Sequence, residues 1–160
     1  MLYIRTIQSN DDPELKQLVQ KSLQTYHLDI PGTAYFDPEL DHLSLYYGAK
    51  VRRQYFVATN EQQAVLGGTG IAEYDLQTQT AELQKLYLTP SAQGQHLSYQ
   101  LLDAAIQFAK QARYHRVYLE THHNLKTAIH VYQKYGFLEL SEPLKRGEYS
   151  AMDCFFAIDI

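Results

Sequence analysis

The stretch Leu86-Tyr87-Leu88-Thr89-Pro90-Ser91-Ala92-Gln93-Gly94-Gln95-His96-Leu97-Ser98 joins a predicted strand to a predicted helix, and the elements around it decide the fold. Pro90 ends the strand because proline cannot donate a hydrogen bond to a sheet. Apolar residues at helical spacing then predict a helix over 97–112. The free N–H groups and the positive dipole end of that helix favour a bound anion such as a pyrophosphate. Many αβ proteins make such turns without a ligand, so the prediction needs support elsewhere in the chain.

Before this stretch, strands and helices do not alternate regularly. Asp12 is the expected N-cap of a first helix, with Pro13 at its first position. A second, shorter helix is expected to begin after Asp37-Pro38 and to end near Gly48. Strands are predicted at 2–7, 54–59 and 64–74, the last two joined by a turn over 60–63.

After this stretch, strands and helices alternate. Together with a strand over 81–89, the pattern predicts a strand at 116–120 and a helix from Asn124 to Gly136, a typical left-handed C-cap. Two more strands are expected at about 137–140 and 151–160. Strands that run together early and alternate with helices later favour an α/β (α+β mixed) fold with a mixed sheet.

Composition limits the possible functions. The 160 residues predict a single domain over 1–160, and the 14 Lys and Arg against 18 Asp and Glu give a formal charge of −4. No basic stretch points to nucleic acid, and no apolar run could cross a membrane or act as a signal peptide. The single cysteine, Cys154, cannot form an internal disulfide, so we expect a reducing, cytoplasmic location.

Two motifs in this order resemble those of the GNAT superfamily of N-acetyltransferases. The family's coenzyme A loop has the pattern Arg/Gln-x-x-Gly-x-Gly/Ala, in which Gln93 fits the first position while His96 and Ser98 replace the two small residues. Gly94 is also typical of the loop. The segment Asn124 to Phe137, NLKTAIHVYQKYGF, is similar to the family's Asn-x-x-Ala-x-x-x-Tyr-x-x-x-Gly-Phe motif: Ala128, Tyr132, Gly136 and Phe137 match it, and Asn124 lies one residue further ahead of Ala128 than the motif has it. Two ordered motifs are far more specific than one.

The resemblance covers roughly residues 53–140 and implies a fold, a reaction and a cosubstrate. The expected fold is a GNAT-like mixed, mostly antiparallel sheet of about seven strands with helices on both faces. The expected reaction moves an acetyl group from acetyl-coenzyme A directly to a primary amine of a small molecule or peptide. The residues expected to bind coenzyme A are Leu86, Tyr87, Leu88, Gln93, Gly94, Gln95, His96, Leu97, Ser98, Asn124 and Ala128.

Catalytic roles follow from the same resemblance. Tyr132 matches the family tyrosine that donates a proton to the coenzyme A sulfur, and a phenol suits this role because it is neutral at pH 7. Glu82, eleven residues ahead of Gln93, is the candidate general base, and burial would raise its pKa toward neutrality. Glu120 is the rival base, at the end of the neighbouring strand. Each of these residues also has a purely structural interpretation: Tyr132 could pack in the core, and Glu82 could lie at a strand edge. Asn124, among the expected coenzyme A contacts, could simply cap its helix.

The acceptor is expected to contact residues 29–41, where aromatic side chains and four carboxylates suit a cationic amine. Tyr35 is the residue we expect to line its pocket, while Asp37 would cap the second helix. No metal is expected, because the adjacent His122 and His123 should point apart on an extended chain and no third ligand is suitably spaced. A homodimer is possible as the default assembly.

Two alternative functions remain open. His96 and Ser98 favour a non-catalytic acyl-coenzyme A binding or sensor module, whereas Tyr132 and Glu82 favour an enzyme. An unrelated nucleotide-binding αβ domain is the weaker alternative, because the mixed strand order and the lack of a glycine-rich loop after the first strand argue against it.

Overall fold

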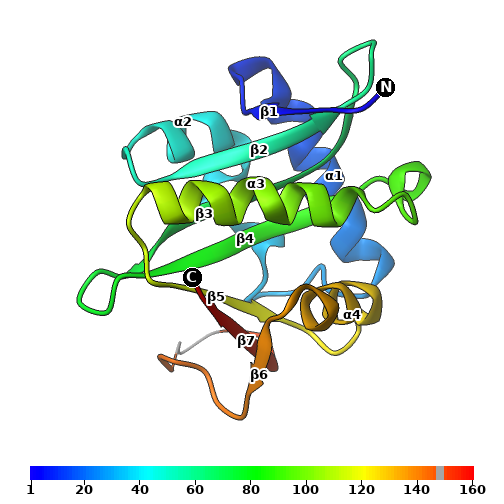
Figure 1. The fold of residues 1–160 in the computed structure, drawn as a ribbon. Coiled ribbons are helices and arrows are strands. Elements are labelled where there is room, and N and C mark those ends of the chain that lie inside the picture. The colour runs from blue at the N-terminus through cyan, green and yellow to red at the C-terminus, as the bar shows by residue number, and fades with distance from the viewer. Residues whose placement is uncertain (147–149) are drawn as a thin grey trace.

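One mixed sheet forms the centre of the protein. The computed structural model describes residues 1–146 and 150–160. Its seven strands follow the order β1-β2-β3-β4-β5-β7-β6 (Figure 1). The β4–β5 pair is parallel, and every other neighbouring pair is antiparallel. The strands are β1 (Tyr3–Thr6), β2 (Gln54–Thr59), β3 (Val65–Asp75), β4 (Thr80–Leu88), β5 (Arg116–Thr121), β6 (Leu138–Leu140) and β7 (Cys154–Asp159).

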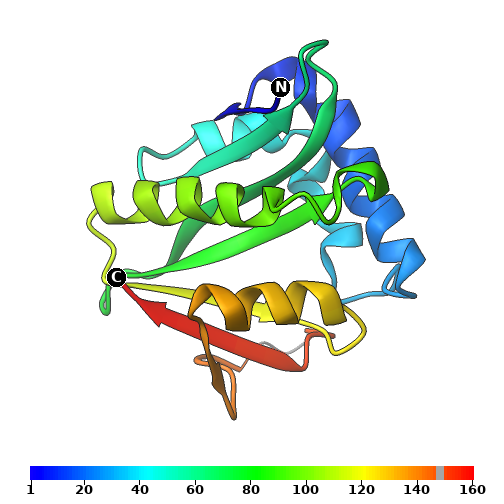
Figure 2. The same ribbon diagram turned by 45° about the vertical axis from the view of Figure 1, so that its right-hand side comes forward.

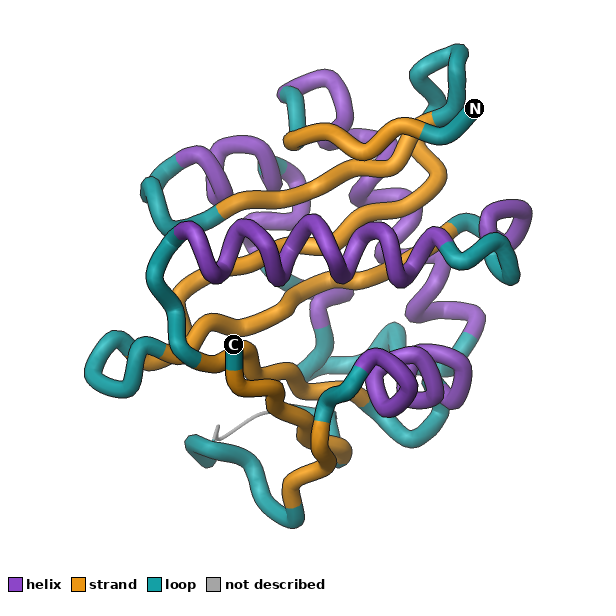
Figure 3. Tube along the Cα trace, in the orientation of Figure 1, coloured by secondary structure: helices purple, strands orange, loops and turns teal. Residues whose placement is uncertain are grey.

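Helices cover both faces of the sheet, as Figure 2 and the tube in Figure 3 show. The helices α1 (Asp12–Thr25) and α2 (Leu43–Gly48) lie on one face, and α3 (Leu97–Gln111) and α4 (Lys126–Tyr135) lie on the other. Short 3₁₀ turns complete the structure at η1 (Ser9–Asp11), η2 (Ala34–Phe36), η3 (Pro38–Asp41) and η4 (Pro90–Ala92). None of the described helices is long and apolar enough to span a bilayer.

Each face has its own hydrophobic core. Leu15, Val19 and Leu43 pack with the fully buried Tyr47 and Tyr55 beneath α1 and α2. On the opposite face, apolar residues of α3 and α4 pack against β3, β4, β5 and β7. Complete burial of one such side chain contributes about 1.5–3 kcal/mol, so both cores hold the helices firmly on the sheet.

A β-bulge interrupts β4 and changes which way its side chains point. Gly68 pairs with Tyr87 and Gly70 pairs with Gln84, so two residues of β4 lie opposite the single Thr69 of β3. Lys85 has a positive φ of 52°, and its carbonyl accepts a hydrogen bond of 2.9 Å from the Tyr55 hydroxyl. A bulge of this kind re-aims a side chain. Gln84 and Lys85 therefore both face the side of α1 and α2.

The sheet opens between its two parallel strands. The β4–β5 ladder pairs only residues 80–82 with residues 116–118, although β4 continues to Leu88. Beyond Glu82, β5 offers that edge of β4 no ladder partner within the described chain. Backbone N–H and C=O groups need partners. This edge is therefore available to another molecule.

The predicted fold is confirmed, with differences at some helix ends. Asp12 is the first residue of α1 and not its N-cap, which is Asp11. The Asp12 carboxylate accepts hydrogen bonds from the backbone N–H and the hydroxyl of Ser44, so it joins α1 to α2. The predicted second helix is divided into η3 and α2, because Pro38 starts a 3₁₀ turn that ends before Leu43.

Candidate functional site

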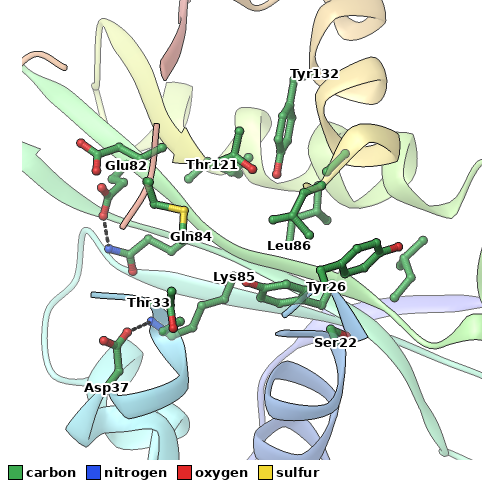
Figure 4. Close-up of a pocket in the computed structure, with 18 of the residues that line it drawn as sticks. Ser22, Tyr26, Thr33, Asp37, Glu82, Gln84, Lys85, Leu86, Thr121 and Tyr132 are labelled. Carbon is green, nitrogen blue, oxygen red and sulfur yellow. Dashed lines mark hydrogen bonds and ion pairs between the residues drawn. The ribbon is translucent and has the colours of Figure 1, made fainter. Parts of the chain in front are cut away.

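A cavity of about 640 Å³ lies where β4 and β5 separate (Figure 4). Residues 82–88 of β4 form one wall, and Glu120 and Thr121 at the end of β5 form another. α1, α4 and the segment 32–39 close the remaining sides. The size and the mixture of apolar and polar lining are typical of a ligand site.

Tyr132 reaches this cavity from α4. Figure 4 shows its ring pointing into the cavity beside Thr121 and Leu86. The side chain is almost fully buried, and its ring packs edge-on against Phe137, which follows the C-cap Gly136. Burial, assisted by the nearby Tyr87, raises the pKa of Tyr132 above its ordinary value. The phenol therefore keeps its proton at every physiological pH.

Glu82 enters the cavity from β4 and is held by a short chain of hydrogen bonds. The hydroxyl of Tyr47 donates to Gln84 Oε1 at 2.7 Å, and Gln84 Nε2 donates to Glu82 Oε1 at 2.6 Å. Burial raises the pKa of the Glu82 carboxyl, and the Gln84 hydrogen bond opposes that shift. The negative charge of Glu120 raises this pKa further, whereas Lys85 lowers it. The pKa of Glu82 therefore lies above that of an ordinary glutamate, which is the direction that a general base requires.

Glu120 has different partners. Its carboxylate accepts a hydrogen bond of 2.8 Å from the Tyr118 hydroxyl and one of 3.3 Å from Ser150 Oγ. Desolvation, with the adjacent Glu120 carboxylate, raises the pKa of Tyr118. Glu120 therefore lies in the same cavity as Glu82, but its carboxylate already accepts hydrogen bonds from two hydroxyl groups.

Lys85 carries the cavity's one lysine or arginine charge among the described residues. Only 6% of its side chain is exposed, and Nζ lies 2.9 Å from Asp37 Oδ2 and 3.6 Å from Glu39 Oε1. Asp37 was expected to cap the second helix, and this is wrong: its side chain makes no capping hydrogen bond. The carboxylate turns to Lys85 because the β4 bulge brings that ammonium group to it (Figure 4).

Part of the strand–loop–helix segment lies at one end of the cavity. Leu86, Tyr87 and Leu88 line it from β4, Gln93 and Ser98 line it from the loop and α3, and Ala128 lines it from α4. Gly94, Gln95 and His96 form an exposed turn beyond the lining, and Leu97 is buried in the core beneath α3. The first N–H groups of α3 follow directly. An α-helix leaves these groups without internal partners.

His96 has an unusual backbone for its residue type. Its φ is 59°, in the left-handed region that favours glycine, and Gly94 also has a positive φ of 79°. The loop therefore keeps the shape that its glycine pattern would allow, with an imidazole at one of the glycine positions. The imidazole is exposed and packs near Tyr99.

Two predicted side chains have other contacts. Asn124 does not cap α4, which begins two residues later; its Nδ2 donates to the carbonyl oxygen of Tyr26 at 3.0 Å and so joins this loop to α1. Tyr35 does not line the cavity, because the η2 turn directs its hydroxyl to Gln24 of α1 at 2.9 Å. The neighbouring Phe36 lines the cavity instead.

The reasoning against a histidine cluster is also corrected. The rings of His122 and His123 lie 4.2 Å apart, and Asp153 brings a carboxylate within 4.8 Å of both. The chain turns at this point, where the Leu125 N–H bonds the His122 carbonyl. His122 Nδ1 accepts a hydrogen bond from the Asn124 N–H, which leaves the proton on Nε2, the atom that faces Asp153. That arrangement suits a hydrogen-bonded cluster, and the absence of a metal stays a prediction.

Sequence reasoning missed Gln84 and Lys85, whereas Glu39 lies in the segment 29–41 that was expected to contact the acceptor. A signal was present in the apolar positions of β4, which run 81, 83, 86 and 88. The odd step from 83 to 86 breaks the strand's alternation and indicates a bulge. Cys154 is half-buried in β7, and desolvation with Asp153 beside it raises the pKa of its thiol to about 11, which disfavours a nucleophilic role.

Comparisons with known proteins show the family of this chain. The Acetyltransferase (GNAT) family matches residues 16–137. The chain is 32% identical over 136 residues to the uncharacterised N-acetyltransferase YjgM of Escherichia coli K12, a match that covers 84% of this chain and 80% of that protein.

Solved structures show the same fold. A GNAT-family acetyltransferase of Staphylococcus aureus is 19% identical with a TM-score of 0.86, covering 99% of both chains. Spermidine N-acetyltransferase of Vibrio cholerae, in complex with CoA and spermine, is 20% identical with a TM-score of 0.71, covering 99% of this chain and 95% of that one. This chain belongs to the GNAT family of acetyltransferases.

Proposed function

We propose that this protein transfers an acetyl group from acetyl-coenzyme A directly to a primary amine of a small molecule or peptide. One observation carries the proposal: a protonated phenol, Tyr132, and a carboxylate of raised pKa, Glu82, share one cavity at the opening between β4 and β5. Acetyl transfer to an amine needs an acid and a base at such a place.

Acetyl-coenzyme A, the proposed donor, would bind along β4 and at the start of α3. The pantetheine arm is an extended chain of amides, and the edge of β4 beyond Glu82 offers backbone groups that have no partner from β5. Gln93 and Ser98 lie where β4 leads into α3, and the helix N-terminus favours the pyrophosphate. The left-handed backbone at His96 preserves the loop's turn.

The proposed chemistry follows from the two side chains. Glu82 accepts a proton from the acceptor ammonium, and the neutral amine attacks the thioester carbonyl. A C–N bond forms, the C–S bond breaks, and Tyr132 donates a proton to the departing thiolate. The phenol is a weaker acid than a thiol, so Tyr132 hydrogen-bonds the thiolate sulfur until the attacking nitrogen, which is cationic after attack, gives up its second proton. That proton replaces the one that Tyr132 donates to the thiolate, and the proton on Glu82 passes to solvent. Glu120 is the rival base.

The charges of the cavity favour a cationic acceptor. Glu82, Glu120, Asp37 and Glu39 line it against the single ammonium of Lys85, so the site carries a negative excess. The Vibrio cholerae relative, whose structure contains spermine, is consistent with such an acceptor. A cytoplasmic location, a single domain over 1–160 and a homodimer stay predictions.

A non-catalytic acyl-coenzyme A sensor is the second candidate, because His96 departs from the family's loop pattern at a glycine-like position. Two measurements separate the candidates: calorimetry with acetyl-coenzyme A, and thiol release with a panel of amines, in which mass spectrometry identifies the acetylated product. Binding with turnover supports the enzyme, and binding without turnover on any amine supports the sensor. No binding at millimolar coenzyme would contradict both.

A further inference from the structure

Lys85 occupies a position in which a lysine is costly. The Lys85 side chain is only 6% exposed. Its neighbours along β4 are Gln84 on one side and apolar residues on the other. Burial disfavours a charged ammonium unless a close partner compensates. Asp37 at 2.9 Å and Glu39 at 3.6 Å provide that compensation.

The two carboxylates belong to a segment that is shaped to present them. Thr33 is buried, and its hydroxyl donates to the carbonyl oxygens of Leu28 and Ile30, which fixes the start of the segment. Asp37 then stands between η2 and η3, and its side chain makes no capping hydrogen bond to η3. Asp37 and Glu39 are 34% and 26% exposed, so both carboxylates remain partly open to the cavity.

These groups together form a cation-binding subsite that is already filled. Without Lys85 the two carboxylates would carry a charge of −2, and with Lys85 the subsite carries −1. The lysine is covalently attached to the cavity wall, so its local concentration exceeds that of any dissolved amine. A second ammonium on the acceptor would have to displace it.

We propose that Lys85 determines acceptor specificity by occupying the cation subsite of Asp37 and Glu39, so that the enzyme prefers acceptors with one amine over diamines. The inference rests on the proposed function and adds a substrate class to it. Glu82 receives the amine that reacts, and Lys85 closes the place where a second positive charge would bind.

The cation subsite and the candidate base Glu82 interact electrostatically. Lys85 lowers and Asp37 raises the pKa of the Glu82 carboxyl, so both charges lie within coulombic reach of the candidate base. Glu82, Lys85 and Asp37 also line one cavity, so a diamine with one end at Glu82 would have its second amine in the cavity where Lys85 holds Asp37.

The test compares Lys85→Met with the unaltered protein on matched pairs of straight-chain amines that differ only in a second terminal amine, such as butylamine and 1,4-diaminobutane. The ratio of kcat/KM for the diamine to that for the monoamine should rise about tenfold or more in Lys85→Met, the scale of a close charge pair. Lys85→Arg keeps the charge and should keep the original ratio. Lys50→Met removes an exposed lysine paired with Glu73 outside the cavity and should also leave the ratio unchanged.

An unchanged ratio in a folded Lys85→Met would overturn the inference while leaving acetyl transfer intact. If Lys85→Met does not fold, Asp37→Asn provides the opposite test. It leaves Lys85 balanced by Glu39 alone, so an amine with a terminal carboxylate should gain on the plain monoamine, and no gain contradicts the subsite. If no amine is acetylated, the proposed function fails, and calorimetric binding of the diamine to both proteins still tests the subsite.

Discussion

The side-chain amide of Gln84 donates a hydrogen bond of 2.6 Å to the carboxylate of Glu82, two residues earlier on the same strand. The amide is held in turn by the buried hydroxyl of Tyr47 on α2. The position of the candidate base therefore depends on how α2 packs against the sheet. Because this packing connects the core to the site, changes in either one should be detectable in the other.

Replacing Tyr132 with phenylalanine tests the proposed acid. The variant keeps the ring that packs against Phe137 and loses only the hydroxyl. Turnover should fall by roughly 10²–10⁴-fold, the usual contribution of a positioned acid. Affinity for acetyl-coenzyme A, measured by calorimetry, should be nearly unchanged.

Tyr135→Phe is the matched control. Tyr135 lies on the same helix, but its hydroxyl binds Asp103, and it does not line the cavity. This variant should keep full turnover. Equal losses in both variants would mean that the helix, and not the acid, had been disturbed.

Glu82→Gln tests the base through pH. The base must be ionised to act, so activity of the unaltered enzyme should fall as pH drops through the pKa of Glu82, which burial raises above that of an ordinary glutamate. The variant should lose this limb and should need a higher pH, at which the amine itself is neutral. If the profiles coincide, Glu82 is structural; if Glu120→Gln shows the change instead, Glu120 is the base.

His96→Gly tests the departure in the coenzyme A loop. Glycine relieves the cost of a left-handed φ, about 1–2 kcal/mol, and removes the imidazole. The variant should bind acetyl-coenzyme A more tightly by calorimetry. His96→Ala separates the two effects, because it removes the ring and keeps the strain. Weaker binding in both variants would show that the imidazole contacts the phosphates.

Gly70→Ala tests the connection between core and site. A Cβ at this position would lie 2.6 Å from the Tyr47 ring, whereas a Cβ at Gly48 would meet nothing within 4 Å. Gly70→Ala should reduce stability by about 1–3 kcal/mol in denaturant unfolding and should also lower turnover, because it displaces the tyrosine that holds Gln84. Gly48→Ala should do neither. Normal turnover in Gly70→Ala would separate Tyr47 from the site.

Local patterns predicted the order of the elements and supplied the two motifs that resemble those of the family. The periodicity of apolar residues located the strands within a few residues, because the positions that are buried in a strand or helix carry apolar side chains at a regular spacing. The helix ends were less predictable: Asp12, Asn124 and Asp37 are all suitable caps, but each side chain binds a distant partner instead.

Contacts between distant parts of the chain determine which residues line the proposed acceptor side of the cavity. Tyr35 and Phe36 are adjacent aromatic residues, and only the packing of η2 on α1 determines that Phe36 and not Tyr35 faces the cavity. His122 and His123 lie close to Asp153, which is thirty residues further along the chain. The spacing of residues near the two histidines could not reveal this contact. Lys85 was different: sequence reasoning missed it, although the broken alternation of apolar residues in β4 was a signal of the bulge.

The most direct test of the central claim is a stoichiometric one. The unaltered protein is incubated with acetyl-coenzyme A carrying an isotope-labelled acetyl group and with a panel of cationic primary amines, and free thiol and labelled product are both counted. The account predicts one labelled acetamide for each thiol released, with no labelled acetyl group retained on the protein. Thiol release without an acetylated amine, or a labelled acetyl-protein intermediate, would contradict direct transfer to an amine.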